Sequence, residues 1–293
     1  METAKSTDTM TPEIMPSGIG LRDDGLPDIV WRLVPEGEFI FGRRGLYDIA
    51  EFQIGRFPVT HIQFQAFVDA SDGYRDPSWW DGLNAKGKEQ QLGGPGESAF
   101  PIPDHPRVNV SWYDAVAFCR WLTGKLGYPV RLPTEQQWEK AARGPNGRNF
   151  AYGDVFDAKK GNARNSGIGM TSPVDAYPEG ASPYGLLDMS GNVWEWALTE
   201  YHDPGSEIRP SNSRRVLKGR SWSCGPISSR ADGSKYFYRD WRYNNVGFRI
   251  VSGHPYAKMT TQCWIVRQSG GAALAKIRHC GSPEKIRQVK RKS

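Results

Sequence analysis

The sequence predicts a mixed α+β domain that is rich in loops and poor in regular secondary structure, and three observations predict it. Glycine and proline are plentiful, with 33 and 21 among 293 residues, and both interrupt helices and strands. Aromatic residues make up 12% of the chain and include 11 tryptophans, enough to pin irregular segments to a core. Stretches with strand-like or helix-like periodicity are short and scattered along the chain. With 38% hydrophobic residues, the chain can bury a sizeable core.

The N-terminal part divides into a polar segment and a strand-rich segment. Residues 1–28 are rich in Ser, Thr, Pro, Asp and Gly and show no periodicity, so they are predicted to be a flexible leader. Short strands are predicted over residues 29–34, 38–41 and 51–54, where β-forming residues are bounded by turn residues. The folded domain is predicted to span residues 29–253.

Capping motifs predict three helices. Thr60 is a suitable N-cap for a run whose aromatic residues share one face. Ser111 and Asp114 have the spacing of a capping box, in which each side chain binds the other residue's backbone N–H. Thr134 and Gln137 repeat this spacing before a third helix. Each motif therefore fixes where a helix begins.

Two long segments lack such signals. Residues 69–106 are rich in Gly and Pro and are predicted to be an irregular segment that Trp79, Trp80 and Phe100 pin to the core. Residues 145–183 are also predicted to be irregular, with a brief strand at 174–177. Further along, the patterns of residues 214–219 and 246–251 predict two short strands near the end of the domain.

The stretch from Tyr184 to Trp196 combines turn residues with large apolar residues. A turn is predicted between Asp188 and Asn192, because Gly and Asn tolerate left-handed backbone. Period-two alternation follows and places Val193 and Glu195 on one face. Two carboxylates with backbone carbonyls between them are the hard oxygen ligands that calcium prefers. The alternative is a tryptophan-rich core turn flanked by solvated acids, and the residues alone leave both open.

The charge of the chain is concentrated at its end. Residues 254–293 hold nine Lys and Arg against the single acid Glu284, a local charge of +8, so the remainder carries about −2 of the total +6. This segment is predicted to be a disordered basic tail. Such a tail can bind nucleic acid or an anionic membrane weakly, although many are only solvated ends.

Cysteine usage and hydropathy suggest a cytoplasmic protein. The four cysteines form neither a CxxC pair nor a regular framework, so neither a zinc site nor a disulfide scaffold is predicted. The N-terminus lacks the pattern of a signal peptide, and no apolar run approaches the roughly 20 residues that span a bilayer.

Seven phrases follow one another across residues 29–251. They are VPEGEFIFG at 34–42, FPVT at 57–60, VNVSWYDA at 108–115, RLPTEQQWEKAARG at 131–144, GNVWEW at 191–196, RVLKGRSW at 215–222 and NVGFR at 245–249. Together they resemble the formylglycine-generating enzyme (sulfatase-modifying factor) family. The resemblance implies a variant of the C-type lectin fold, an α+β architecture held together largely by loops.

The resemblance also favours calcium at the predicted turn. A calcium site of the family falls on this stretch, and the matching ligands are the side chains of Asp188 and Glu195 and the carbonyls of Gly191 and Val193. The expected role of the ion is structural, because it would clamp a turn.

The catalytic positions depart from the family pattern. The family's enzyme holds copper between two thiolates and uses oxygen to convert a substrate cysteine to formylglycine. Cys224 matches the first thiolate and Ser221 is retained, but Ser229 stands at the second thiolate position. A hydroxyl is a poor ligand for Cu(I), so copper is not expected and these three residues are at most vestiges of a catalytic site. The alternative is a metal-dependent oxidoreductase that acts on protein cysteine with altered ligands.

Residues 223–243 resemble the hypervariable segment of the variable proteins of diversity-generating retroelements, which are ligand binders with this fold. In those genes the adenines of asparagine codons are randomised, and most residue types found here can arise in that way; Lys235 and Trp241 require other adenine-containing codons. The candidate binding residues are Ser223, Cys224, Gly225, Ile227, Ser228, Lys235, Tyr236, Phe237, Tyr238, Trp241, Tyr243 and Asn244.

The chemistry of this segment suits a binding surface. Tyr, Trp and Arg supply large contact areas at low entropic cost and are enriched in binding hot spots. About a third of the aromatic residues are expected to be buried. The sequence therefore predicts a non-enzymatic protein that binds a protein or other macromolecular ligand through residues 223–243.

Overall fold

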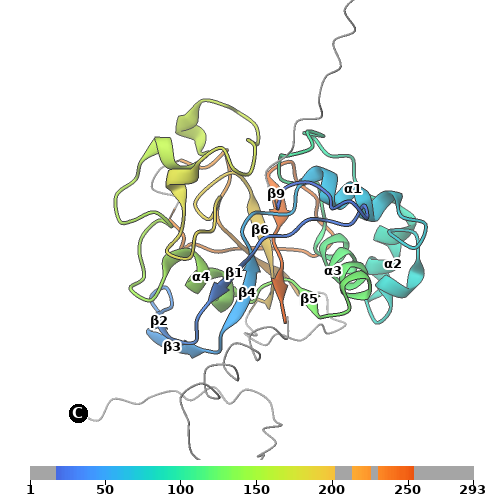
Figure 1. The fold of residues 1–293 in the computed structure, drawn as a ribbon, viewed down its shortest axis with the longest axis horizontal. Helices are drawn as coiled ribbons and strands as arrows, with labels where there is room; N and C mark the ends of the chain where they lie inside the picture. Colours follow the sequence, from blue (N-terminus) through green and yellow to red (C-terminus); the bar gives the residue numbers. More distant parts are fainter. Residues whose placement is uncertain (1–17, 202–212, 226–229, 254–293) are drawn as a thin grey trace, which may run out of the picture.

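A computed structural model describes residues 18–201, 213–225 and 230–253 (Figure 1). The predicted tail, residues 254–293, and residues 1–17 of the predicted leader lie outside the described residues. Between the described ends, short strands cross the middle of the molecule, and helices and long loops surround them (Figure 1).

One sheet joins the beginning of the domain to its end. The strands in order are β1 (Trp31–Val34), β4 (Phe52–Gly55), β10 (Val251–Ser252) and β5 (Val130–Arg131). β10 pairs antiparallel with both β4 and β5, and β1 pairs antiparallel with β4 at the edge of the sheet. The predicted strands near residues 29–34 and 51–54 are thus confirmed.

A second sheet contains several of the predicted site residues. β6 is buried over almost its whole length and pairs with β7 on one side and, in parallel, with β9 on the other. The order is β8 (Lys235–Phe237), β7 (Arg215–Lys218), β6 (Trp194–Glu200) and β9 (Val246–Phe248). A separate hairpin pairs β2 (Gly37–Ile40) with β3 (Leu46–Ile49).

The three predicted helices are confirmed, with their capping boxes. The elements are α1 (His61–Asp69), α3 (Trp112–Leu126) and α4 (Glu135–Arg143). Thr60, Ser111 and Thr134 each accept a bond from the third helical residue, whose side chain in turn accepts one from the cap's backbone.

The segment between α1 and α3 is more regular than predicted. It contains a 3-10 turn, η1 (Pro77–Trp80), and a helix, α2 (Ala85–Leu92), capped by the side chain of Asn84. The sequence AKGKEQQL has no apolar stripe, so hydrophobic periodicity could not reveal this helix. By contrast, residues 145–183 contain only single 3-10 turns, η2 (Ala158–Lys160), η3 (Arg164–Ser166) and η4 (Pro178–Gly180), as the prediction of an irregular segment requires.

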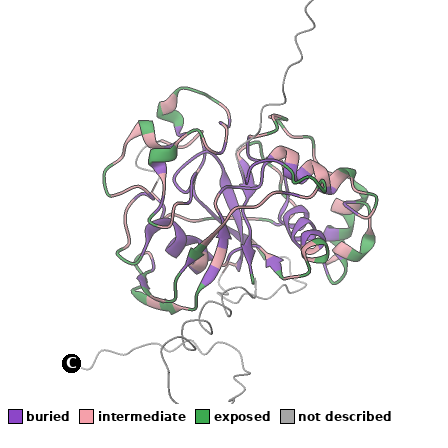
Figure 2. Ribbon diagram, in the orientation of Figure 1, coloured by how far each residue is buried: buried purple, intermediate pink, exposed green. Residues whose placement is uncertain are grey.

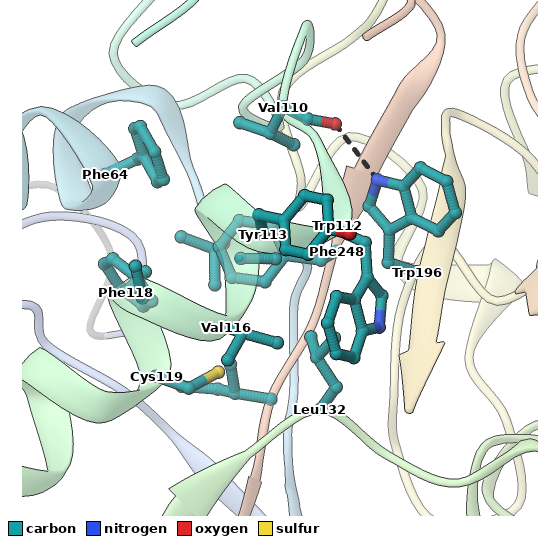
Figure 3. Packing of buried hydrophobic residues seen from close by; sticks show 14 of the residues in the cluster. Phe64, Val110, Trp112, Tyr113, Val116, Phe118, Cys119, Leu132, Trp196 and Phe248 are labelled. Atoms are coloured by element: carbon teal, nitrogen blue, oxygen red, sulfur yellow. Dashed lines mark hydrogen bonds between the residues drawn. The ribbon is translucent and has the colours of Figure 1, made fainter. Parts of the chain in front are cut away.

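The main core is aromatic and lies between α3 and the second sheet (Figure 3). Phe118 stacks on Phe64 and meets Phe248 edge-on, with ring centroids 5.8 and 5.4 Å apart. Two of the buried indole groups donate to backbone carbonyls: Trp196 Nε1 to Val110 at 3.0 Å, and Trp112 Nε1 to Ala197 at 3.1 Å. Buried residues accordingly fill the centre of the molecule (Figure 2).

Part of the predicted leader belongs to the folded domain. Ile19 is buried, and its carbonyl accepts a bond from Thr60 Oγ1 at 2.7 Å. Gln63 Nε2 donates to the carbonyls of Gly18 and Asp28 at 3.2 and 2.7 Å. The boundary predicted at residue 28 is therefore too late, because the capping box of α1 also holds the preceding segment in place.

Candidate functional site

The predicted turn between Asp188 and Asn192 is confirmed, and side chains hold it rigidly. Both residues have left-handed backbone with φ of 60°. Asn192 Nδ2 donates to Asp188 Oδ2 at 2.8 Å and to the Ser172 carbonyl at 3.0 Å. Gly191 is required here, because a Cβ atom would lie 2.6 Å from the Asn162 carbonyl oxygen.

Glu195 is fully buried and already has a cationic partner. Arg249 donates Nε to Glu195 Oε2 at 2.6 Å and Nη2 to Oε1 at 2.7 Å, and neither side chain is exposed. Trp138 Nε1 also donates to Oε2 at 2.6 Å. A solvated acid, the alternative left open by the sequence, is therefore wrong for Glu195.

Asp188 is a buried carboxylate of a different kind. Burial raises the pKa of Asp188 to about 8, although the bond from Asn192 and the charge of Arg249 favour the ionised form. A cation beside Asp188 would offset the free-energy cost of burying its ionised carboxylate. Its carboxylate therefore stays a predicted calcium ligand, together with the carbonyls of Gly191 and Val193.

The fourth predicted ligand, Glu195, already has partners. Both of its oxygens accept from Arg249, so calcium at this position would have to share the carboxylate with that arginine or displace it. Among the described residues, no group of three or more His, Cys, Asp and Glu side chains is arranged to hold a metal. The donor set matches calcium only in part, and calcium at this turn stays a prediction.

Cys224 lies among hydroxyl and amide groups. Ser221 is buried, and its Oγ lies 3.6 Å from Cys224 Sγ and 3.0 Å from Ser223 Oγ. Asn245 Nδ2 donates to both hydroxyls, at 3.3 and 3.1 Å. The other described cysteine, Cys119, is buried on α3, where burial raises the pKa of its thiol. Ile227, Ser228 and Ser229 lie outside the described residues.

Two cations cover the indole ring of Trp194. Arg220 Cζ and Lys235 Nζ lie 4.8 and 4.9 Å from its centroid, and Trp194 itself is buried. Cation–π attraction of this kind holds Lys235 in place although its side chain is exposed. The candidate binding residue Lys235 is thus oriented by the scaffold beneath it.

Four aromatic side chains gather at the end of β8 and on the segment that follows it. We call Phe237, Tyr238, Trp241 and Tyr243 the aromatic cluster. Trp241 lies at its centre, with centroids 5.2, 5.7 and 5.5 Å from the rings of Phe237, Tyr238 and Tyr243. Tyr238, Trp241 and Tyr243 are 48%, 38% and 40% exposed.

Phe237 connects the aromatic cluster to the main core, against which it packs while half-buried. Tyr236, its neighbour on β8, is also half-buried, but its ring lies 4.4 Å from that of Tyr201 and outside the cluster. None of the five aromatic residues from 236 to 243 is fully buried, so the expectation that a third would be core was wrong. Ser223, Gly225 and Asn244, with Cys224, are also at least partly exposed.

Two arginines between the aromatic residues point inward and anchor the segment. Arg242 donates Nε and Nη2 to the two oxygens of the buried Asp114, both at 2.9 Å. Arg239 is buried and donates Nε to the Ser213 carbonyl at 3.0 Å, and its own carbonyl accepts from the Trp112 N–H.

Sequence reasoning missed the second role of Asp114, which caps α3 and also holds Arg242. It missed Lys86 as well, which extends from α2 to Asp240 at 2.7 Å. The only signal for either was the interleaving of arginines with aromatic residues after β8.

The fold defines the class: a loop-rich α+β domain with a formylglycine-generating-enzyme-like variant of the C-type lectin fold. In this domain, Arg239 and Arg242 bind the scaffold and hold the segment that carries the aromatic cluster. Comparison with known families agrees with that class. The model of the sulfatase-modifying factor enzyme 1-like domain matches residues 26–253, and the chain belongs to this family.

Relatives in the family differ in the activity that their names state. The chain is 32% identical over 249 residues to inactive C-alpha-formylglycine-generating enzyme 2 of Bos taurus, covering 70% of this chain and 78% of that protein. It is 32% identical over 281 residues to hercynine oxygenase of Mycolicibacterium smegmatis, covering 78% of this chain but 62% of that protein. Both an enzyme and a protein named as inactive thus share this domain.

One solved structure with the same fold is Treponema denticola variable protein 1. It superposes with a TM-score of 0.59 at 20% identity, covering 76% of this chain and 95% of that one. This likeness confirms the predicted fold. Within the described part of the chain, no helix has the length and apolar character needed to cross a membrane.

Proposed function

We propose that the protein is a non-enzymatic ligand-binding protein that presents the aromatic cluster to a protein or other macromolecule. The observation that carries the proposal is the cluster itself. Its rings touch one another, yet three of them are more than a third exposed. Exposed, mutually packed Tyr and Trp rings lose little side-chain entropy on binding and supply most hot-spot contacts.

The anchoring arginines support the same function. Arg239 and Arg242 bind the scaffold while the aromatic residues beside them face outward. A surface arranged in this way tolerates changes at the exposed positions without loss of the fold. Ser223, Cys224, Gly225, Lys235 and Asn244 would extend the contact surface. Tyr236 and the positions 227 and 228 belong to the predicted segment, the latter two outside the described residues.

A matched pair of double variants tests the binding surface. We expect Tyr238→Ser/Trp241→Ser to abolish the capture of a specific macromolecule that the wild-type protein retains on a column. The control Leu46→Ser/Val155→Ser removes apolar side chains that are 65% and 81% exposed elsewhere. Quantitative mass spectrometry compares the captured material. If every captured species is retained equally by both variants, the aromatic cluster is not the binding surface.

The rival function is a metal-dependent oxidoreductase that acts on protein cysteine through Cys224. Ser221 is retained beside Cys224, which is the observation in its favour. Titration of Cu(I) against a chromogenic chelator separates the two functions. Tight stoichiometric binding that is lost in Cys224→Ser, together with oxidation of a cysteine-containing peptide, would establish the enzyme. We expect neither.

The gene provides an independent test of diversification. A reverse transcriptase beside the gene and a near-copy of the coding segment for residues 216–250, differing only at adenines, would support a diversified surface. A lone gene without such a copy would contradict diversification but not binding.

A further inference from the structure

A cavity outside the aromatic cluster combines buried polar atoms with apolar walls. It has a volume of about 410 Å³ and lies between α1 and the loop that leads to α3. Figure 1 shows these elements side by side. The lining residues are His61, Gln65, Val68, Pro95, Gly96, Glu97, Ser98, Pro101 and Arg107.

Arg107 is the unusual member of this lining, because it is 3% exposed and forms no ion pair within the described residues. Its guanidinium stacks 4.9 Å from the ring of Phe64 and donates to the Gly96 carbonyl, and Nη1 lies 3.4 Å from His61 Nδ1. Its Nε is buried without a partner. Burial lowers the pKa of Arg107 to about 10, so the group stays charged at neutral pH.

The local charge is not balanced. The carboxylate that most offsets the charge of Arg107 is Asp114, but both of its oxygens are bonded to Arg242. The buried Arg107 and the half-buried Arg242 therefore share one carboxylate, and the positive charge of Arg107 is left without an ion-pair partner beside the cavity. A buried charge without a counter-ion is costly, and an anion in the cavity would offset that cost.

Two more groups suit an anion. Ser98 Oγ is buried without a partner. His61 has a pKa lowered by burial and by Arg107, so it is neutral near pH 7. If Arg107 donates to Nδ1, the proton of His61 sits on Nε2, which is then a further donor. Glu97 also lines the cavity and disfavours a highly charged anion, but it forms no ion pair with Arg107.

We propose that this cavity binds a small organic monocarboxylate. The carboxylate would accept from Arg107 and Ser98, and the apolar body would pack against Val68, Pro95 and Pro101. A guanidinium and a hydroxyl match the planar carboxylate, and Glu97 favours one negative charge over two. This site is separate from the proposed macromolecular surface and does not depend on it.

Fluorine NMR of the full chain tests the site with 4-fluorobenzoate as the probe. We expect its signal to broaden on addition of protein, while 4-fluorobenzyl alcohol, a neutral molecule of similar size, stays sharp. Arg107→Met should weaken binding by about tenfold or more, because a bond to a charged group is lost. Equal broadening of both molecules would overturn the proposal.

A second pair of variants keeps the test decisive if Arg107→Met does not fold. Val68→Trp fills the apolar end of the cavity and should abolish broadening, while Leu46→Ser, at an exposed position on β3 outside the cavity lining, should leave it unchanged. Broadening that persists in Val68→Trp would place the probe elsewhere and overturn the proposal. Competition by inorganic phosphate at lower concentration than by benzoate would overturn the carboxylate assignment.

Discussion

The turn at 188–195 and the aromatic cluster both rest on an arginine bound to a carboxylate, yet they face opposite environments. Arg249 and Glu195 are wholly buried, and every polar atom of that carboxylate is bonded inside the protein. Arg242 and Asp114 form the same kind of pair, but the neighbours of Arg242 in the chain are exposed rings. The Arg249–Glu195 pair is sealed within the core, whereas the Arg242–Asp114 pair fixes a loop whose aromatic side chains remain exposed to solvent.

This difference explains how one domain can be both rigid and adaptable. A buried pair constrains the residues around it, because loss of either partner leaves an isolated charge in the core. An exposed aromatic ring, by contrast, restricts only the side chains that it contacts directly. We therefore expect substitutions at the turn to change stability and substitutions at the cluster to change binding, and four predictions test that contrast.

The largest effect is expected from Arg249→Met. It leaves Glu195 as an unpaired buried charge with only the bond from Trp138, so the free energy of unfolding should fall by about 3–5 kcal/mol. Chemical denaturation measures the loss. Arg22→Met, which removes an exposed pair with Asp24, is the control and should cost no more than about 1 kcal/mol. Similar losses in the two variants would show that the buried Arg249–Glu195 pair stabilises the fold no more than an exposed pair does.

Arg242→Met should have a smaller and more local effect. Asp114 keeps its bonds from Ser111 and Tyr74 when the arginine is lost, so we expect a cost of about 2 kcal/mol. Hydrogen exchange should accelerate in residues 235–246 and stay slow in residues 194–200. Uniform acceleration would mean that Arg242 stabilises the whole domain rather than residues 235–246 alone.

Sequence patterns predicted the scaffold well where local physical chemistry decides structure. The caps at Thr60, Ser111 and Thr134 each depend on two neighbouring residues, and all three helices begin there. The turn between Asp188 and Asn192 was likewise predicted from local residue types, and both residues have left-handed backbone. Resemblance of short phrases supplied the topology, which no local pattern contains.

The rest depended on long-range partners that no pattern reveals. The sequence predicted Glu195 as a calcium ligand but could not show that Arg249, 54 residues away, donates to both of its oxygens. Asp114 reaches Arg242 over 128 residues. In the same way, periodicity could not divide the aromatic residues into core and surface, because the inward arginines rather than the rings anchor that segment.

Calcium binding tests whether Glu195 stays paired with Arg249 when the ion is present. Arg249 already neutralises the charge of Glu195, so Asp188 is the one carboxylate among the predicted ligands without a cationic bonding partner, and we expect weak binding. Calcium at tenfold above its Kd would then stabilise the fold by about 1.4 kcal/mol, which thermal unfolding with and without EDTA can measure. Asp188→Ala should remove the effect. Tight binding at micromolar calcium would mean that Glu195 exchanges its arginine for the ion.

The smallest effect on stability should come from Tyr238→Ser. Tyr238 is 48% exposed and contacts Trp241 at 5.7 Å, so its loss removes one aromatic contact worth about 1 kcal/mol at most. Phe248→Ala, which opens a cavity in the main core, should cost about 3–5 kcal/mol in the same denaturation experiment. If Tyr238→Ser proved as costly as Phe248→Ala, the aromatic cluster would be part of the core rather than a surface free to bind.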